Sequence, residues 1–195
     1  MKIQKLIIVL NVFLSMSTYN PIMPIMQNGL KLESFGDSSI SKELYDYILA
    51  NLPKGSTILE LGSGWATDQL AKYYTLYSIE HDKKWINTYA SNYIYAPLKN
   101  GWYDTSCIEE NLPKQYDLIL VDGPVGSTAR KGFLDNIFLF NTDAIIIIDD
   151  LDRPNEFEMI HILAEMLDRE IEIYSGAGKK FGVLTKIKNK DAINL

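Results

Sequence analysis

The sequence predicts an α/β fold: a doubly wound, mostly parallel seven-stranded sheet with an antiparallel last strand and helices on both faces. Strand-like and helix-like segments alternate from residue 38 onward, as in parallel sheets joined by helical crossovers. The apolar run 144–148 lacks polar alternation, so it suits a strand covered on both faces. Residues 170–187 resemble two strands joined by a glycine turn, which predicts the closing antiparallel strand.

Local signals place the elements in order. Residues 39–52 form an amphipathic helix that ends at Pro53 and Gly55, and residues 56–61 form a strand that runs into glycines. Further helices are predicted over residues 66–74, 83–90, 132–140 and 154–168, and further strands over 75–80, 93–98, 116–121 and 144–148. Residues 99–115 are expected to form a loop.

Composition limits the class of protein. The chain has 195 residues, 47% of them hydrophobic, and contains no repeat, so residues 38–195 suit one domain. Its net charge of −6 argues against nucleic acid as the main partner and favours a small molecule. The single cysteine, Cys107, excludes an intrachain disulfide and a cysteine-rich zinc site.

Residues 1–37 form a separate segment. It begins with lysines and an apolar stretch from Leu6 to Met16, the outline of a signal peptide. A helix that packs on the domain as a lid, or that makes a homodimer contact, explains the same pattern. The stretch is too short for an integral membrane span. We expect a cytoplasmic protein, with a secreted or targeted protein as the alternative.

The stretch Glu60-Leu61-Gly62-Ser63-Gly64 is the first chemical motif. Glycines after a strand let the backbone approach a ligand. Glu80 follows at the end of the next strand, where an acid can accept both hydroxyls of a ribose. A dinucleotide site requires a third glycine where Thr67 stands, and Glu60 would repel a pyrophosphate. The motif therefore favours the cationic S-adenosylmethionine over a nicotinamide cofactor.

Residues 55–187 resemble a class I S-adenosylmethionine-dependent methyltransferase, through "ELGSG", Glu80, "YDLILVDGP" and the final hairpin. The resemblance implies that Gly62 and Gly64 pass beside the methionine part of the cofactor and that Glu60 orients its amino group. It also implies that His81 lies near the adenine and that Asp104 contacts the adenine region. For His81 and Asp104, an ordinary solvated loop position is the alternative.

Three acids end two neighbouring predicted strands: Asp122 ends one, and Asp149 and Asp150 end the other. Clustered carboxylates require a cation or a proton between them, and Mg²⁺ or Ca²⁺ prefers such oxygens. The pattern is similar to the metal-dependent O-methyltransferases, although Val125 stands where the catechol enzymes have a lysine base. Without a metal, Asp122 or Asp150 could itself take the acceptor proton.

A structural role is the alternative for these acids: Asp149 and Asp150 would cap the next helix and pair with Arg153, while Asp122 orders the following turn. The favoured function is methyl transfer to a hydroxyl of a small molecule or sugar. A nicotinamide-dependent oxidoreductase and a non-catalytic partner subunit remain as alternatives.

Overall fold

The computed structural model describes residues 39–126, 130–176 and 178–187. The expected lid, homodimer-contact or targeting segment, residues 1–37, lies outside the described residues. Within these ranges, none of the helices combines the length and hydrophobicity needed to cross a bilayer. The predicted cytoplasmic location stays a prediction.

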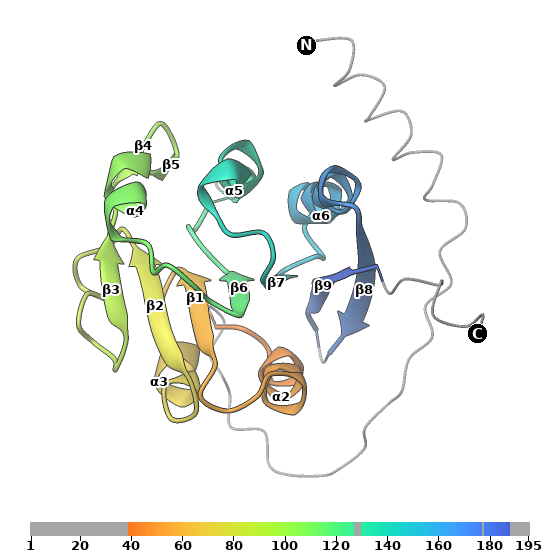
Figure 1. The fold of residues 1–195 in the computed structure, drawn as a ribbon, viewed down its shortest axis with the longest axis horizontal. Helices are drawn as coiled ribbons and strands as arrows, with labels where there is room; N and C mark the ends of the chain where they lie inside the picture. Colours follow the sequence, from red (N-terminus) through yellow and green to blue (C-terminus); the bar gives the residue numbers. More distant parts are fainter. Residues whose placement is uncertain (1–38, 127–129, 177, 188–195) are drawn as a thin grey trace.

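A seven-stranded sheet forms the centre of the molecule, as predicted (Figure 1). Its strands run in the order β3-β2-β1-β6-β7-β9-β8. The strands β3, β2, β1, β6 and β7 are parallel, whereas β9 is antiparallel to both β7 and β8. The bounds are β1 Thr57–Leu61, β2 Thr75–Glu80, β3 Asn92–Tyr95, β6 Leu118–Val121, β7 Ile145–Ile148, β8 Arg169–Ser175 and β9 Lys180–Lys186.

Helices cover both faces of this sheet (Figure 1). One face carries α2 (Lys42–Asn51) and α3 (Trp65–Leu70); the other carries α4 (Thr105–Asn111), α5 (Lys131–Asp135) and α6 (Pro154–Leu167). Successive strand residues point to opposite faces, so Ile147 packs in the core of α2 and α3 while Ile146 and Ile148 pack in the other core. The isoleucine run is therefore buried on both sides, as expected.

The predicted helix over residues 83–90 is wrong, because this segment forms successive turns. The amides of Trp85 and Thr88 donate to carbonyls three residues earlier, and Asn87 has a φ of 61°, which an α-helix does not allow. The Asp82 side chain accepts from the Lys84 amide. Local side-chain bonds thus replace the helical pattern.

The predicted loop over residues 99–115 is also wrong. A short hairpin joins β4 (Leu98–Lys99) to β5 (Trp102–Tyr103), and α4 follows it directly. Asn100 and Gly101 make the hairpin turn with φ angles of 56° and 83°, which is the backbone that an Asn-Gly pair favours. The helix expected over 132–140 divides into α5 and a 3₁₀ turn, η2 (Ile137–Leu139).

Candidate functional site

A cavity of about 620 Å³ opens at the carboxyl edge of the parallel strands. Its volume is in the range of cavities that hold a small organic ligand. Six of the predicted site residues line it, namely Gly62, Ser63, Gly64, Glu80, His81 and Asp122. Its other lining residues include Ser39, Trp65, Trp85, Tyr89, Tyr103, Pro124 and Val125.

Two glycine turns meet at the floor of this cavity. Gly62 follows β1 with a φ of +92°, a conformation that costs other residues strain. A Cβ atom on Gly62 would lie 3.3 Å from the Cα atom of Gly123, and one on Gly123 would lie 2.9 Å from the Gly62 backbone. The close approach explains why both turns carry glycine.

The carboxylate of Glu80 organises the turn beside it. One oxygen accepts hydrogen bonds from the amides of His81 and Asp82, at 2.6 and 2.8 Å. The other accepts from the amide of Ser63 at 3.0 Å. Glu80 thereby joins the ends of β1 and β2, and its side chain is only 4% exposed. A ribose bound here would share the carboxylate with these amides.

Glu60 lies below the cavity rather than on its wall. It is 4% exposed, and its carboxylate accepts a 2.5 Å hydrogen bond from the Ser78 hydroxyl. Burial, only partly offset by the Ser78 and Thr67 hydroxyls, raises the pKa of Glu60 to about 7. The acid that was expected to orient the cofactor's amino group is therefore buried behind the cavity wall, where its neutral form is favoured.

Asp104 lies away from the first cavity. It caps the start of α4 by accepting from the Ser106 amide at 3.2 Å. With Trp102, Tyr103 and Lys131 it lines a second cavity of about 590 Å³. Tyr103 lines both cavities, so the expected adenine contact of Asp104 would lie on the far side of that ring.

The three acids at the ends of β6 and β7 converge as predicted from their places in the sequence. Asp122, Asp149 and Asp150 each offer a carboxylate oxygen within 4.8 Å of the other two. Asp149 is fully buried, whereas Asp122 is 26% exposed at the cavity. Asp150 adopts a left-handed backbone with a φ of 59°, which turns the chain sharply at the end of β7.

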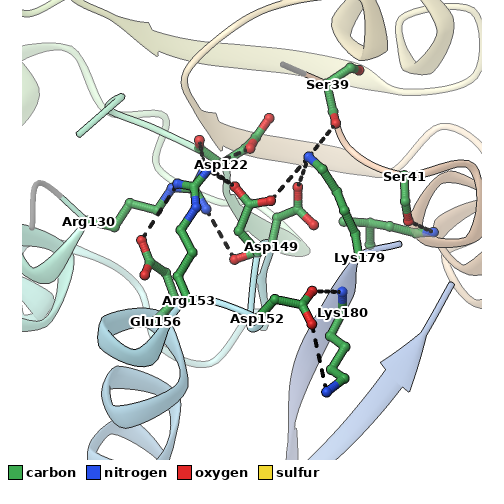
Figure 2. Close-up of polar contacts among 12 residues, drawn as sticks. Ser39, Ser41, Asp122, Arg130, Asp149, Asp152, Arg153, Glu156, Lys179 and Lys180 are labelled. Carbon is green, nitrogen blue, oxygen red and sulfur yellow. Dashed lines mark hydrogen bonds and ion pairs between the residues drawn. The ribbon is translucent and has the colours of Figure 1, made fainter. Parts of the chain in front are cut away.

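Two cations that the sequence did not place lie among these acids, Arg130 and Lys179 (Figure 2). Arg130 is 4% exposed, and one of its nitrogens lies 3.0 Å from Asp122 and 2.9 Å from Asp150. Lys179 lies 3.1 Å from Asp150 and 3.6 Å from Asp149. The sequence required positive charge at this cluster but held no signal for which distant basic residue supplies it.

Arg130 also holds the backbone at this edge. Its guanidinium donates to the carbonyl oxygens of Asp149, at 3.1 Å, and Asp122, at 2.5 Å. These are the first carbonyls after β7 and β6, so one buried side chain ties two strand ends together. Such multiple donation is what the planar guanidinium fork allows.

The structure confirms one part of the structural role that was the alternative for these acids, namely the pairing with Arg153. Arg153 pairs with Asp150 at 2.9 Å, as that alternative requires. However, the N-cap residue of α6 is Arg153 itself, with no side-chain cap, so Asp149 and Asp150 do not cap that helix. Arg153 also lies 3.9 Å from the buried Glu156, extending the row of alternating charges into α6 (Figure 2).

The three acids differ in pKa, because burial, mutual repulsion and the neighbouring cations act on each of them to a different extent. Burial, together with the charge of Asp149, raises the pKa of Asp122 well above its usual value. Burial and the charge of Asp150 likewise raise the pKa of Asp149. For Asp150, burial acts in the same direction, but Arg130 and Lys179 outweigh it and hold the pKa below its usual value. Asp150 is thus the fixed anion of the cluster.

The carboxylate oxygens of Asp149 and Asp122 fit a divalent cation. Both carboxylate oxygens of Asp149 are buried without a hydrogen-bond partner in the part of the chain that the structure describes. Asp122 offers a further oxygen nearby, and carboxylate oxygens suit Mg²⁺ and Ca²⁺. Arg130 and Lys179 already neutralise Asp150, so an ion here would compete with two built-in cations.

No protein-family model and no curated protein matches the sequence. Solved structures share its fold. A Staphylococcus aureus protein assigned as a caffeoyl-CoA O-methyltransferase is 16% identical over 75% of this chain and 84% of that chain, with a TM-score of 0.50. The ribosomal protein L11 methylase of Lactobacillus delbrueckii subsp. bulgaricus is 12% identical over 74% and 77%, with a TM-score of 0.52. The chain therefore has the Rossmann-like fold of class I methyltransferases.

Proposed function

We propose that this protein is an S-adenosylmethionine-dependent methyltransferase whose acceptor is a hydroxyl of a small molecule or sugar. The observation that carries the proposal is the cavity itself, in which the Gly62 turn, Glu80 and Asp122 come together at the strand edge. The fold supports this proposal at the level of methyl transfer. The two structures of similar fold are named for different acceptors, an acyl-CoA compound and a ribosomal protein, so the acceptor is argued from this chain alone.

The residues of the cavity fit the cofactor. The Gly62 turn lines the cavity and would pass beside the methionine part, and Glu80 would bind the ribose hydroxyls. His81 is proposed to border the adenine from within this cavity. Asp104, which lines the second cavity, is proposed to contact the adenine region from across the Tyr103 ring. Glu60, buried beneath the turn, would favour the cationic amino group in its ionised form, and that cation would in turn lower its raised pKa. Ser63 and Gly64 would complete the backbone wall.

The cofactor supplies a methyl group already activated on its sulfonium. What remains for the protein is to bring the acceptor into line with that methyl group and to exclude water. Asp122, partly exposed at the cavity with a raised pKa, is proposed to take the proton from the acceptor hydroxyl. Asp150 is the second proposed proton acceptor. It would be the weaker base of the two, because Arg130 and Lys179 hold its pKa below the usual value.

A divalent cation is the second part of the proposal. Asp122, Asp149 and Asp150 would hold Mg²⁺ or another divalent ion, which would lower the pKa of an acceptor hydroxyl. The oxygens of Asp149 support an ion at this position, because they have no hydrogen-bond partner among the described residues and Lys179 lies 3.6 Å away. In the competing arrangement Arg130, Lys179 and Arg153 supply the counter-charges without a metal ion. Metal binding alone distinguishes the two.

The test is calorimetric titration of the protein with S-adenosylhomocysteine, first with chelator and then with excess Mg²⁺. We expect micromolar binding in both conditions. Mg²⁺ titrated alone should bind to the wild type and not to Asp149→Asn. Absence of nucleoside binding in every condition would refute the methyltransferase. Equal heats of Mg²⁺ addition for the wild type and Asp149→Asn would refute the metal site alone.

A further inference from the structure

Within the part of the chain that the structure describes, one buried tyrosine hydroxyl at the cavity has no hydrogen-bond partner. Tyr103, on β5, is 1% exposed, lines the cavity, and its hydroxyl lacks a hydrogen-bond partner among the described residues. Buried hydroxyls normally find partners, because leaving one unpaired costs stability. A hydroxyl left unpaired in a ligand cavity indicates that the ligand supplies the partner.

The Gly123 turn and His81 are neighbours of this tyrosine in the cavity. A Cβ atom on Gly123 would lie 2.6 Å from the Tyr103 hydroxyl oxygen, so the oxygen stands against the Gly123 turn. The Tyr103 ring meets the His81 ring edge-on, with centroids 6.1 Å apart. His81 follows Glu80, the proposed ribose ligand.

The described residues offer no acceptor to this hydroxyl. The Glu80 carboxylate already accepts from the amides of Ser63, His81 and Asp82. Burial first, and then the charges of Glu80 and Asp122, raise the pKa of Tyr103 well above its usual value, so the hydroxyl keeps its proton and remains a donor. Ser39, which is 6% exposed and lines the same cavity, has a second hydroxyl without a hydrogen-bond partner in the described ranges.

We propose that the Tyr103 hydroxyl donates a hydrogen bond to the nucleoside cofactor and is a further binding residue of this site. The inference rests on the proposed function, since it takes S-adenosylmethionine as the ligand. It assigns Tyr103 to ligand binding rather than to the stability of the fold. The two roles predict opposite effects of removing one oxygen atom.

The test compares two tyrosine-to-phenylalanine variants. Tyr74 is the matched control: it is 6% exposed, but its hydroxyl donates to the carbonyls of Ile48 and Leu52 at 3.2 and 3.1 Å. Tyr103→Phe should bind S-adenosylhomocysteine about threefold to tenfold more weakly, the effect of one neutral hydrogen bond, with an unchanged or higher unfolding temperature without ligand. Tyr74→Phe should retain its affinity and unfold at a lower temperature.

Each outcome decides a different point. Wild-type binding that Tyr103→Phe retains in full would overturn the inference while leaving the methyltransferase standing. A ligand-free unfolding temperature that falls in Tyr103→Phe as far as in Tyr74→Phe would also overturn it, because the hydroxyl would then have a partner inside the protein. Failure of the wild type to bind S-adenosylhomocysteine would refute the proposed function first.

Discussion

Single residues carry the strain and the unusual protonation of this site. Glu60 is the clearest case, because its carboxylate is buried and bonded chiefly to the hydroxyl of Ser78. Nothing in the pattern of a glycine-rich turn distinguishes an acid on the cavity wall from one beneath it. The sequence therefore indicated an acid at this site but not that it is buried. Burial raises its pKa to about 7, against the opposing hydrogen bonds of Ser78 and Thr67, and it depends on the finished fold.

The raised pKa of Glu60 predicts how stability depends on pH. The native state holds this proton up to about pH 7, whereas the unfolded chain releases it near the ordinary value of 4.5. Raising the pH from 4.5 to 7 should therefore remove about 3 kcal/mol of unfolding free energy through this group. Urea unfolding of the wild type and Glu60→Gln across that range measures it. A pH slope that Glu60→Gln shares in full would contradict the assignment.

The glycines also predict graded effects on stability. Gly62→Ala places a side chain at a φ of +92°, and Gly123→Ala places a Cβ atom 2.6 Å from the Tyr103 hydroxyl. Each variant should therefore lose about 1–3 kcal/mol of unfolding free energy. Gly64 has a φ of −172° and open space around it. Gly64→Ala should change the unfolding free energy by less than about 0.5 kcal/mol. Denaturant midpoints check the order, which equal losses at all three positions would refute.

At the scale of elements, long and strongly patterned segments were predictable and short ones were not. The isoleucine strand β7 and the helix α6 were both expected close to their observed bounds. The hairpin of β4 and β5 was missed, although its Asn100-Gly101 pair is a known turn signal. Residues 83–90 have a helix-like apolar pattern, but Asn87 and the Asp82 side chain stabilise turns instead.

The hairpin turn between β8 and β9 yields a prediction about Lys179. Its ammonium contacts the buried carboxylates of Asp149 and Asp150, and Lys179→Met would leave them short of one counter-charge. We expect a loss of about 1–3 kcal/mol, moderated because Lys179 is 26% exposed. Lys180 is the control, since its side chain pairs at 3.7 Å with the exposed Asp152. Urea unfolding should show almost no change for Lys180→Met; matching losses would refute the role of Lys179.

At the scale of the molecule, the parallel sheet is what brings the site together. The residues after β1, β2, β6 and β7 meet at one edge because these strands are parallel and in register. This topology follows from the alternation of strands and helices, so the convergence of Asp122, Asp149 and Asp150 was predictable. The insertion of Arg130 and Lys179 was not, because both come from connections whose path depends on the finished fold.

Ligand binding should stabilise the whole domain. S-adenosylhomocysteine at about one hundred times its dissociation constant should add about 2.7 kcal/mol, which for a chain of this length raises the unfolding temperature by about 5–10 °C. NADH should cause no shift, because Glu60 and Thr67 disfavour a pyrophosphate. Thermal unfolding with each ligand measures this, and a shift with NADH alone would favour the oxidoreductase.

The contact between Lys179 and Ser39 links the acids to the start of the described chain. The Lys179 ammonium donates to the Ser39 carbonyl at 2.9 Å while it contacts Asp149 and Asp150. Ser39 also lines the cavity. Any tag, cleavage site or fusion joint placed immediately before residue 39 would therefore disturb both the position of Lys179, which neutralises the acids, and the wall of the cavity. Expression boundaries for this protein are best drawn well upstream of that serine.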